Sequence, residues 1–97
     1  MMTYQEIYKQ VKTGQATFVD VRTKEEYDMG HIPGAILCDL QTLMEKAQDI
    51  LKDQQKTYYI YCQSGNRSQF AEMQLKMMGY QKVFDIGGII DWPFEIE

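Results

Sequence analysis

Apolar residues along the chain fall into short blocks whose spacing predicts alternating strands and helices. Four short apolar runs have the β-branched and aromatic composition of core strands, at residues 17–21, 35–38, 57–61 and 82–86. The segments between them carry apolar residues at helical spacing. This alternation predicts an α/β fold with a mostly parallel central sheet of about five strands and helices on both faces. We expect residues 1–97 to form a single small domain.

Each predicted helix has a recognisable first or last residue. Two helices begin at a threonine followed three positions later by a glutamate, a capping box in which each residue's side chain bonds the other's backbone. A third helix begins at an aspartate, and a glycine is placed to end three of the four helices. These positions are Thr3 with Glu6, Thr23 with Glu26, Asp39, and Gly14, Gly30 and Gly79.

Residues 57–68 combine a strand, a polar turn and the start of a helix. Cys62 ends the strand, at the sheet edge where open α/β folds place their ligands. Free N–H groups at a helix start favour an anion, so we expect the pKa of Cys62 to lie below the free-thiol value of about 8.5. Gly65 permits the tight turn, and Arg67 adds a cation for an oxyanion. We therefore predict a nucleophilic cysteine, only partly desolvated at the strand's exposed end.

Composition and charge limit the class of partner. The 97 residues are 44% hydrophobic and 25% charged, which is ordinary for a soluble globular chain. The net charge of -4, without a basic stripe, argues against nucleic acid or an anionic membrane. The N-terminus lacks a signal-peptide pattern, and no apolar run approaches the ~20 residues of a membrane span. Two cysteines without such a signal predict reduced thiols and a cytoplasmic protein.

Three motifs, in the right order and spacing over nearly the whole chain, resemble those of rhodanese-like domains. Residues 27–35, Tyr-Asp-Met-Gly-His-Ile-Pro-Gly-Ala, resemble the amino-terminal motif of that family, and the preceding Asp-Val-Arg at 20–22 resembles its associated element. Residues 62–67, Cys-Gln-Ser-Gly-Asn-Arg, resemble its active-site loop. The carboxyl-terminal motif is matched by Gly79-Tyr80, Val83, Gly87-Gly88 and Trp92.

The resemblance implies a thiosulfate sulfurtransferase that needs no cofactor or metal. In such proteins the loop cysteine, here Cys62, takes the sulfane sulfur of thiosulfate or another persulfide donor and becomes a persulfide. It then passes that sulfur to cyanide or to a thiol or protein acceptor. The resemblance further implies that the loop backbone binds the persulfide and that Arg67 holds the donor's oxyanion end. The implied substrate-binding residues are Gln63, Ser64, Gly65, Asn66 and Arg67.

Several other residues that could carry chemistry have simpler interpretations. In the resemblance, His31 belongs to a structural turn, and a thiolate at a helix start needs no base. Cys38 is interpreted as a small core residue, because its neighbours form a buried strand. Asp20 and Arg22 are interpreted as a pair that braces the loop. No cluster has metal-ligand spacing.

Two alternatives remain open from the sequence. A cysteine-loop phosphatase or arsenate reductase also closes its loop with arginine, but over five intervening residues, whereas residues 63–66 number four. Rhodanese-like domains also serve as non-catalytic binding or regulatory modules, although those commonly lack the loop cysteine.

One residue of the loop departs from part of the family. Some thiosulfate-preferring members carry a basic residue where this chain has Gln63, so we expect weaker thiosulfate binding.

Overall fold

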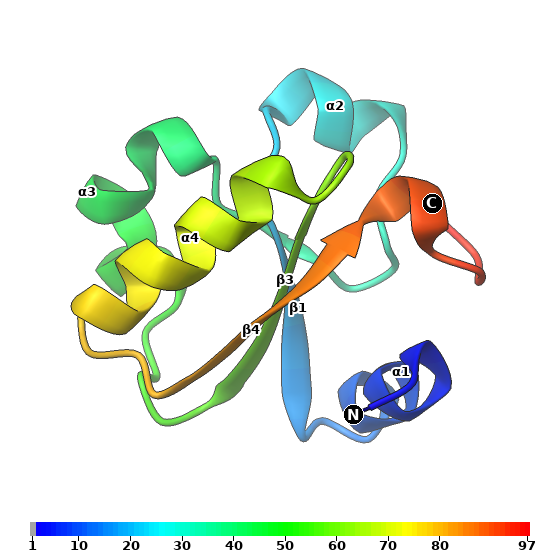
Figure 1. Cartoon of the computed structure of the whole chain (residues 1–97), viewed down its shortest axis with the longest axis horizontal. Coiled ribbons are helices and arrows are strands. Elements are labelled where there is room, and N and C mark those ends of the chain that lie inside the picture. Colours follow the sequence, from blue (N-terminus) through cyan, green and yellow to red (C-terminus); the bar gives the residue numbers. More distant parts are fainter. Residues whose placement is uncertain (1) are drawn as a thin grey trace.

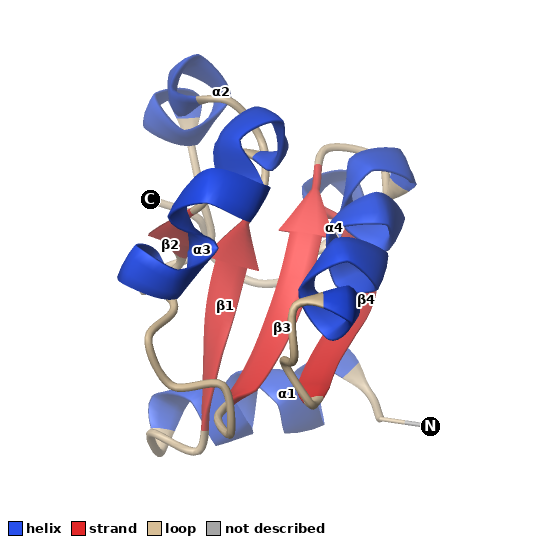
Figure 2. Ribbon diagram, turned by 90° about the vertical axis from the view of Figure 1, so that its left-hand side faces the viewer, coloured by secondary structure: helices blue, strands red, loops and turns tan. Residues whose placement is uncertain are grey.

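A computed structural model describes residues 2–97, and Met1, the first residue of the predicted domain, lies outside the described residues. Four parallel strands form one sheet in the order β2-β1-β3-β4 (Figures 1 and 2). This confirms the predicted α/β fold with a parallel sheet, although the strand number is four where about five were expected. The strands are β1 (Ala16–Asp20), β2 (Ile36–Leu37), β3 (Thr57–Cys62) and β4 (Lys82–Gly88).

The helices begin and end close to the predicted residues. Both capping boxes form, with the threonine hydroxyl accepting from the glutamate N–H and the glutamate carboxylate accepting from the threonine N–H. Asp39, however, caps a short 3-10 helix that precedes the third α-helix, where its carboxylate accepts from the N–H of Gln41 at 3.0 Å. The helices are α1 (Tyr4–Lys12), α2 (Lys24–Met29), η1 (Leu40–Thr42), α3 (Leu43–Ile50), α4 (Asn66–Met77) and η2 (Ile89–Asp91).

The side chains of β3 alternate between two cores, one on each face of the sheet. Tyr58, Ile60 and Cys62 join a cluster with residues of α3 and α4, whereas Tyr59 and Tyr61 join a second cluster with residues of α1 and the C-terminal segment. Successive side chains of a strand point to opposite faces, so two buried faces require an almost fully apolar strand. Figure 2 shows α3 and α4 in front of the sheet and α1 behind it.

The second predicted strand is the least regular element. Only Ile36 and Leu37 pair with β1, opposite Val19 and Asp20. Ile36 is partly exposed, because β2 lies at the sheet edge. None of the helices within residues 2–97 is both long and apolar enough to cross a bilayer.

Candidate active site

Cys62 ends β3 beneath a tight loop that leads directly into α4. Gly65, the residue before α4, has φ 102°, a left-handed conformation that favours glycine. Its N–H donates to Cys62 Sγ at 3.0 Å. The start of α4 has no capping side chain of its own, so the sulfur receives one of the N–H groups that a helix start leaves free. The strand-turn-helix prediction for this segment is therefore confirmed.

Hydrogen bonds favour the thiolate form of Cys62. Burial raises the pKa of the thiol, but the Ser68 hydroxyl and the backbone N–H groups of Ser68, Gly65 and Arg67 outweigh it and hold the pKa below its ordinary value. The hydroxyl lies 3.4 Å from Sγ. The direction of this shift agrees with the sequence-based prediction, and most of its causes are loop and helix N–H groups.

The expected partial exposure of Cys62 is wrong, because the residue is only 1% exposed. The end of β4 covers the loop from one side, where Gly88 pairs with Cys62 across the sheet. A Cβ added to Gly88 would overlap the carbonyl group of Gln63 and lie 2.6 Å from Ser64 Cα. The loop and β4 therefore approach so closely that the sulfur lies beneath backbone, a contact between distant segments that the sequence does not reveal.

Ser68 and Asp85 form a polar contact behind the sulfur that the sequence analysis missed. Ser68 is fully buried, and its hydroxyl donates to Asp85 Oδ1 at 2.6 Å. The same carboxylate oxygen accepts the N–H of Gly87 at 2.8 Å. A serine hydroxyl has one proton, so Asp85 and the Cys62 sulfur compete for it. The only sequence signal is a small polar residue in the first turn of the helix that follows the loop.

Arg67 forms a bidentate salt bridge with Glu26 of α2. Its two terminal nitrogens lie 2.7 and 2.8 Å from the two carboxylate oxygens of Glu26. The bond from Arg67 is the main cause that lowers the pKa of Glu26 to about 2, with support from Thr23. The same glutamate closes the capping box of α2, so one carboxylate fixes both the helix and the loop.

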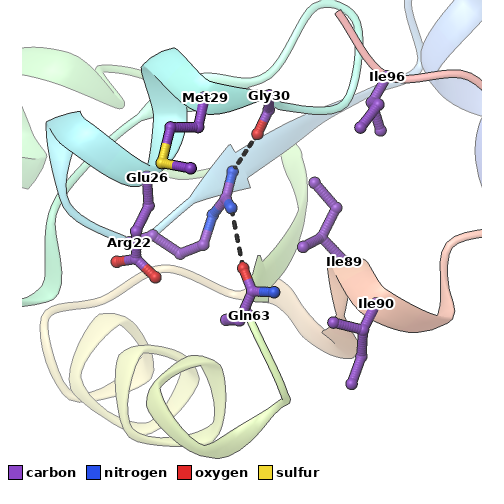
Figure 3. Close-up of a pocket in the computed structure, with 8 residues that line it drawn as sticks. All are labelled: Arg22, Glu26, Met29, Gly30, Gln63, Ile89, Ile90 and Ile96. Carbon is purple, nitrogen blue, oxygen red and sulfur yellow. Dashed lines mark hydrogen bonds between the residues drawn. The ribbon is translucent and has the colours of Figure 1, made fainter.

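Asp20 and Arg22 brace the beginning of the loop, as predicted. Arg22 is nearly buried and bonds the carboxylate of Asp20 at 2.7 Å. Its remaining donors reach Gln63 Oε1 at 3.1 Å and the carbonyl of Gly30 at 2.7 Å (Figure 3). The charge pair at the end of β1 thereby links the active-site loop to the end of α2.

The other predicted residues lie around this centre or away from it. Ser64 and Asn66 are exposed on the loop. His31 lies in the predicted turn, where its ring stacks on that of Tyr27 with centroids 3.8 Å apart and its backbone N–H donates to the carbonyl of Glu97. Cys38 is 2% exposed in the core, in agreement with the sequence interpretation.

Comparison with known proteins decides the family. The family model described as "Rhodanese-like domain" matches residues 3–93. The chain belongs to the rhodanese-like sulfurtransferase family. Thiosulfate sulfurtransferase PspE of Escherichia coli is 35% identical over 74 residues, which cover 76% of this chain and 71% of PspE.

Longer relatives contain a similar segment. Adenylyltransferase and sulfurtransferase uba4 of Ogataea parapolymorpha is 41% identical over 81% of this chain, and the putative sulfur carrier protein YrkF of Bacillus subtilis is 35% identical over 81%. The chain spans only 20% of the first protein and 42% of the second. These relatives therefore support the assignment of the domain to its family. Their activities as whole proteins are not transferred to this chain.

Solved structures agree with the fold along nearly the full chain. A rhodanese-like domain protein from Staphylococcus aureus superimposes with a TM-score of 0.82 at 32% identity, covering 99% of this chain and 94% of that protein. A structure titled "rhodanese with anions from E. coli" gives 0.78 at 32% identity, covering 84% and 96%. Both likenesses extend over most of each chain, so the rhodanese fold applies to the whole sheet and its helices.

Proposed function

We propose that the protein is a sulfurtransferase that carries sulfane sulfur as a persulfide on Cys62. The observation that carries this proposal is the environment of Sγ, a buried sulfur that receives the Gly65 N–H at 3.0 Å and has a lowered pKa. A thiolate is the nucleophilic form of cysteine, and the persulfide that replaces it is also an anion. Loop N–H groups can stabilise both states, with Arg67 closing the loop.

The reaction has two steps, both of which balance without a cofactor. In the first, the Cys62 thiolate bonds to the outer sulfur of the donor, and the donor's sulfur–sulfur bond breaks. With thiosulfate, sulfite leaves with the electron pair. In the second, an acceptor thiolate bonds to the outer sulfur of the persulfide, which regenerates the Cys62 thiolate. Cyanide can replace the acceptor and leave as thiocyanate.

The partners we propose are a small sulfur donor, thiosulfate or another persulfide, and a thiol or protein acceptor, with neither nucleic acid nor a membrane involved. The name of PspE as a thiosulfate sulfurtransferase supports the donor class, and that of YrkF as a putative sulfur carrier supports an acceptor protein. A cytoplasmic location and a single domain over residues 1–97 remain predictions. The family assignment and the reduced state of both thiols are compatible with them.

Two observations weigh against a phosphatase or arsenate reductase. The loop has four residues between Cys62 and Arg67, which leaves less room for a tetrahedral oxyanion than a loop of five. Both terminal nitrogens of Arg67 are already bound to Glu26, so an oxyanion would have to share them. The same pair bears on the role proposed for Arg67, which can hold a donor's oxyanion end only in competition with Glu26.

Mass spectrometry of the intact protein tests the proposal. Incubation with thiosulfate should add one sulfur atom, and cyanide should remove it. The Cys62→Ser variant should take up no sulfur, whereas Cys38→Ser should behave as the wild type because Cys38 lies in the core. Sulfur uptake by Cys62→Ser would refute the assignment. If neither the wild type nor Cys38→Ser took up sulfur, and both released phosphate from an aryl phosphate, the phosphatase alternative would be favoured.

A further inference from the structure

A pocket opens beside the active-site loop, and most of its wall is apolar. Its volume is about 490 Å³, and Gln63, the residue after Cys62, forms part of the wall. Four large apolar side chains surround it: Met29, Ile89, Ile90 and Ile96 (Figure 3). Met29 is 90% exposed and Ile90 is 64% exposed. Solvent-exposed apolar side chains that line one pocket are typical of a binding site.

The charged groups at this pocket neutralise one another. Arg22 is the only cation among its lining residues in the part of the chain that the structure describes, and it is bound to Asp20 at 2.7 Å. Glu26 is the only lining anion in the same range, and it is bound to Arg67 at 2.7 Å. Two carboxylates thus balance two guanidinium groups. A dianion such as thiosulfate therefore meets no surplus positive charge here that would offset the loss of its hydration.

Gln63 offers this pocket an uncharged hydrogen-bond donor. Its Oε1 accepts from Arg22 at 3.1 Å, and a guanidinium can only donate, so the orientation of the amide is fixed. The amide nitrogen consequently points away from Arg22, on the side that faces Ile89 and Ile90 (Figure 3). A single neutral donor within an apolar wall suits a ligand with one weakly charged polar end and an organic body.

We propose, building on the sulfurtransferase function above, that this pocket binds the apolar organic group of the sulfur donor. The preferred donors are then organic persulfides or thiosulfonates, and thiosulfate is a poor substitute that leaves the pocket largely unfilled. Transfer from a thiosulfonate balances as before. The Cys62 thiolate bonds to the outer sulfur, the donor's sulfur–sulfur bond breaks, and a sulfinate leaves with the electron pair, near the Gln63 amide.

Steady-state kinetics with two thiosulfonates test the pocket. Benzenethiosulfonate and methanethiosulfonate share the same charge and the same reacting sulfur, and differ in the size of the organic group. Burial of the ring should raise kcat/KM for the benzene donor about tenfold or more over the methane donor. Thiosulfate should be the poorest of the three. Equal kcat/KM for the two thiosulfonates, or a preference for thiosulfate, would overturn the proposal.

Substitutions locate the preference in the pocket. Ile90→Ser should lower the benzene-to-methane ratio of kcat/KM about fivefold, because the ring loses an apolar neighbour. Met44→Ser is the matched control, since Met44 is 62% exposed on α3 and lies outside the pocket lining. Gln63→Lys should raise kcat/KM for thiosulfate about fivefold through the added cation. An unchanged ratio in Ile90→Ser would show that the ring binds elsewhere.

A binding measurement separates this inference from the proposed reaction. Calorimetry on the Cys62→Ser variant should detect benzenesulfonate, an unreactive analogue, more strongly than methanesulfonate. If benzenesulfonate binds in this way but no donor ever loads sulfur onto the wild type, the pocket stands and the sulfurtransferase function fails. If sulfur is transferred but the two sulfonates bind equally, the function stands and the pocket inference fails.

Discussion

The two cysteines of this protein are almost equally buried, but their pKa values are shifted in opposite directions. Cys62 is 1% exposed and Cys38 is 2% exposed, and both face the same core cluster. Burial raises the pKa of Cys38 to about 11, and the negative charge of Asp39 adds to this effect. At Cys62 the same burial is outweighed by hydrogen bonds, chiefly from Ser68 and from backbone N–H groups, and the pKa falls.

The difference shows that exposure does not decide which of the two thiols has the lowered pKa. What distinguishes Cys62 is its place at the start of α4, where the Gly65 N–H donates to its sulfur. Cys38 follows the short edge strand β2 and leads into η1, whose first turn is already capped by the carboxylate of Asp39. A helix start that is left free for a sulfur creates a thiolate site, whereas one already occupied by a carboxylate does not.

The largest expected difference is in alkylation. At neutral pH, a thiol of pKa about 11 is ionised in only about one molecule in ten thousand. Cys62, with a pKa below that of an ordinary thiol, should react with iodoacetamide at least about 100-fold faster than Cys38. The rates are measured against pH in Cys38→Ser and Cys62→Ser. Because exposure is matched, equal rates at neutral pH would contradict the role assigned to the loop.

A smaller effect is expected when the hydroxyl behind the sulfur is removed. Ser68→Ala takes away a donor to the Cys62 thiolate, so the pKa of Cys62 should rise and the alkylation profile should move to higher pH. Loss of one hydrogen bond, about 1 kcal/mol, should slow sulfur loading at neutral pH about fivefold. A profile that stays in place would mean that the backbone N–H groups alone stabilise the anion.

Asp85→Asn is the matched variant with the opposite sign. In the wild type, the Ser68 hydroxyl donates to Asp85 at 2.6 Å, so its one proton is held by the carboxylate, and the sulfur 3.4 Å away competes for it. An asparagine keeps an oxygen for the Gly87 N–H, but that oxygen is uncharged and accepts the Ser68 proton more weakly, which leaves the proton freer for Cys62. The pKa of Cys62 should therefore fall further, and alkylation should persist to lower pH. A shift in the same direction as Ser68→Ala would disprove the competition for the proton.

The smallest expected effect concerns the ion pair that closes the loop. The side chains of Glu26 and Arg67 are 30% and 37% exposed, so Glu26→Gln should lower the free energy of unfolding by only about 0.5–1 kcal/mol. The pKa of Glu26 is lowered, so its contribution is fully present above about pH 4.5 and is lost as pH falls through about 2.

Urea denaturation at about pH 6 and about pH 3 measures this loss, and the difference between variant and wild type should shrink at the lower pH. Asp28→Asn is the control, because it breaks a more exposed pair with Lys24 on the same helix. The released Arg67 should also improve the use of thiosulfate. A larger loss of stability at low pH would contradict the sign derived from the pKa of Glu26.

Sequence reasoning succeeded where the determining contacts are local. The capping boxes at Thr3 and Thr23 depend on residues three positions away, and both form. The place of Cys62 at the end of a strand, before a tight turn and a helix start, follows from elements that are adjacent in the chain. The pairing of Asp20 with Arg22 is equally local.

The missed features depend on residues that are distant in the sequence. Glu26 and Arg67 are 41 positions apart, and Ser68 and Asp85 are 17 apart, so periodicity and spacing carry no signal for either contact. The burial of Cys62 depends on Gly88, which approaches the loop only once β4 has paired with β3. The strand predicted at residues 35–38 is shorter in the structure, where only Ile36 and Leu37 pair with β1. Apolar composition alone does not distinguish a strand at a sheet edge from a buried loop.

The braces of the active-site loop also determine when its chemistry appears during folding. The contact of Arg22 with Gln63 spans 41 positions, as does that of Glu26 with Arg67. Contacts of such sequence separation close late, because the intervening chain must first lose its freedom. A growing or partly folded chain should therefore hold Cys62 as an ordinary, largely protonated thiol. We therefore expect the pKa of Cys62 to reach its folded value only once β1, α2 and β4 hold the loop in shape, which would protect an unfinished chain from premature reaction with sulfur donors.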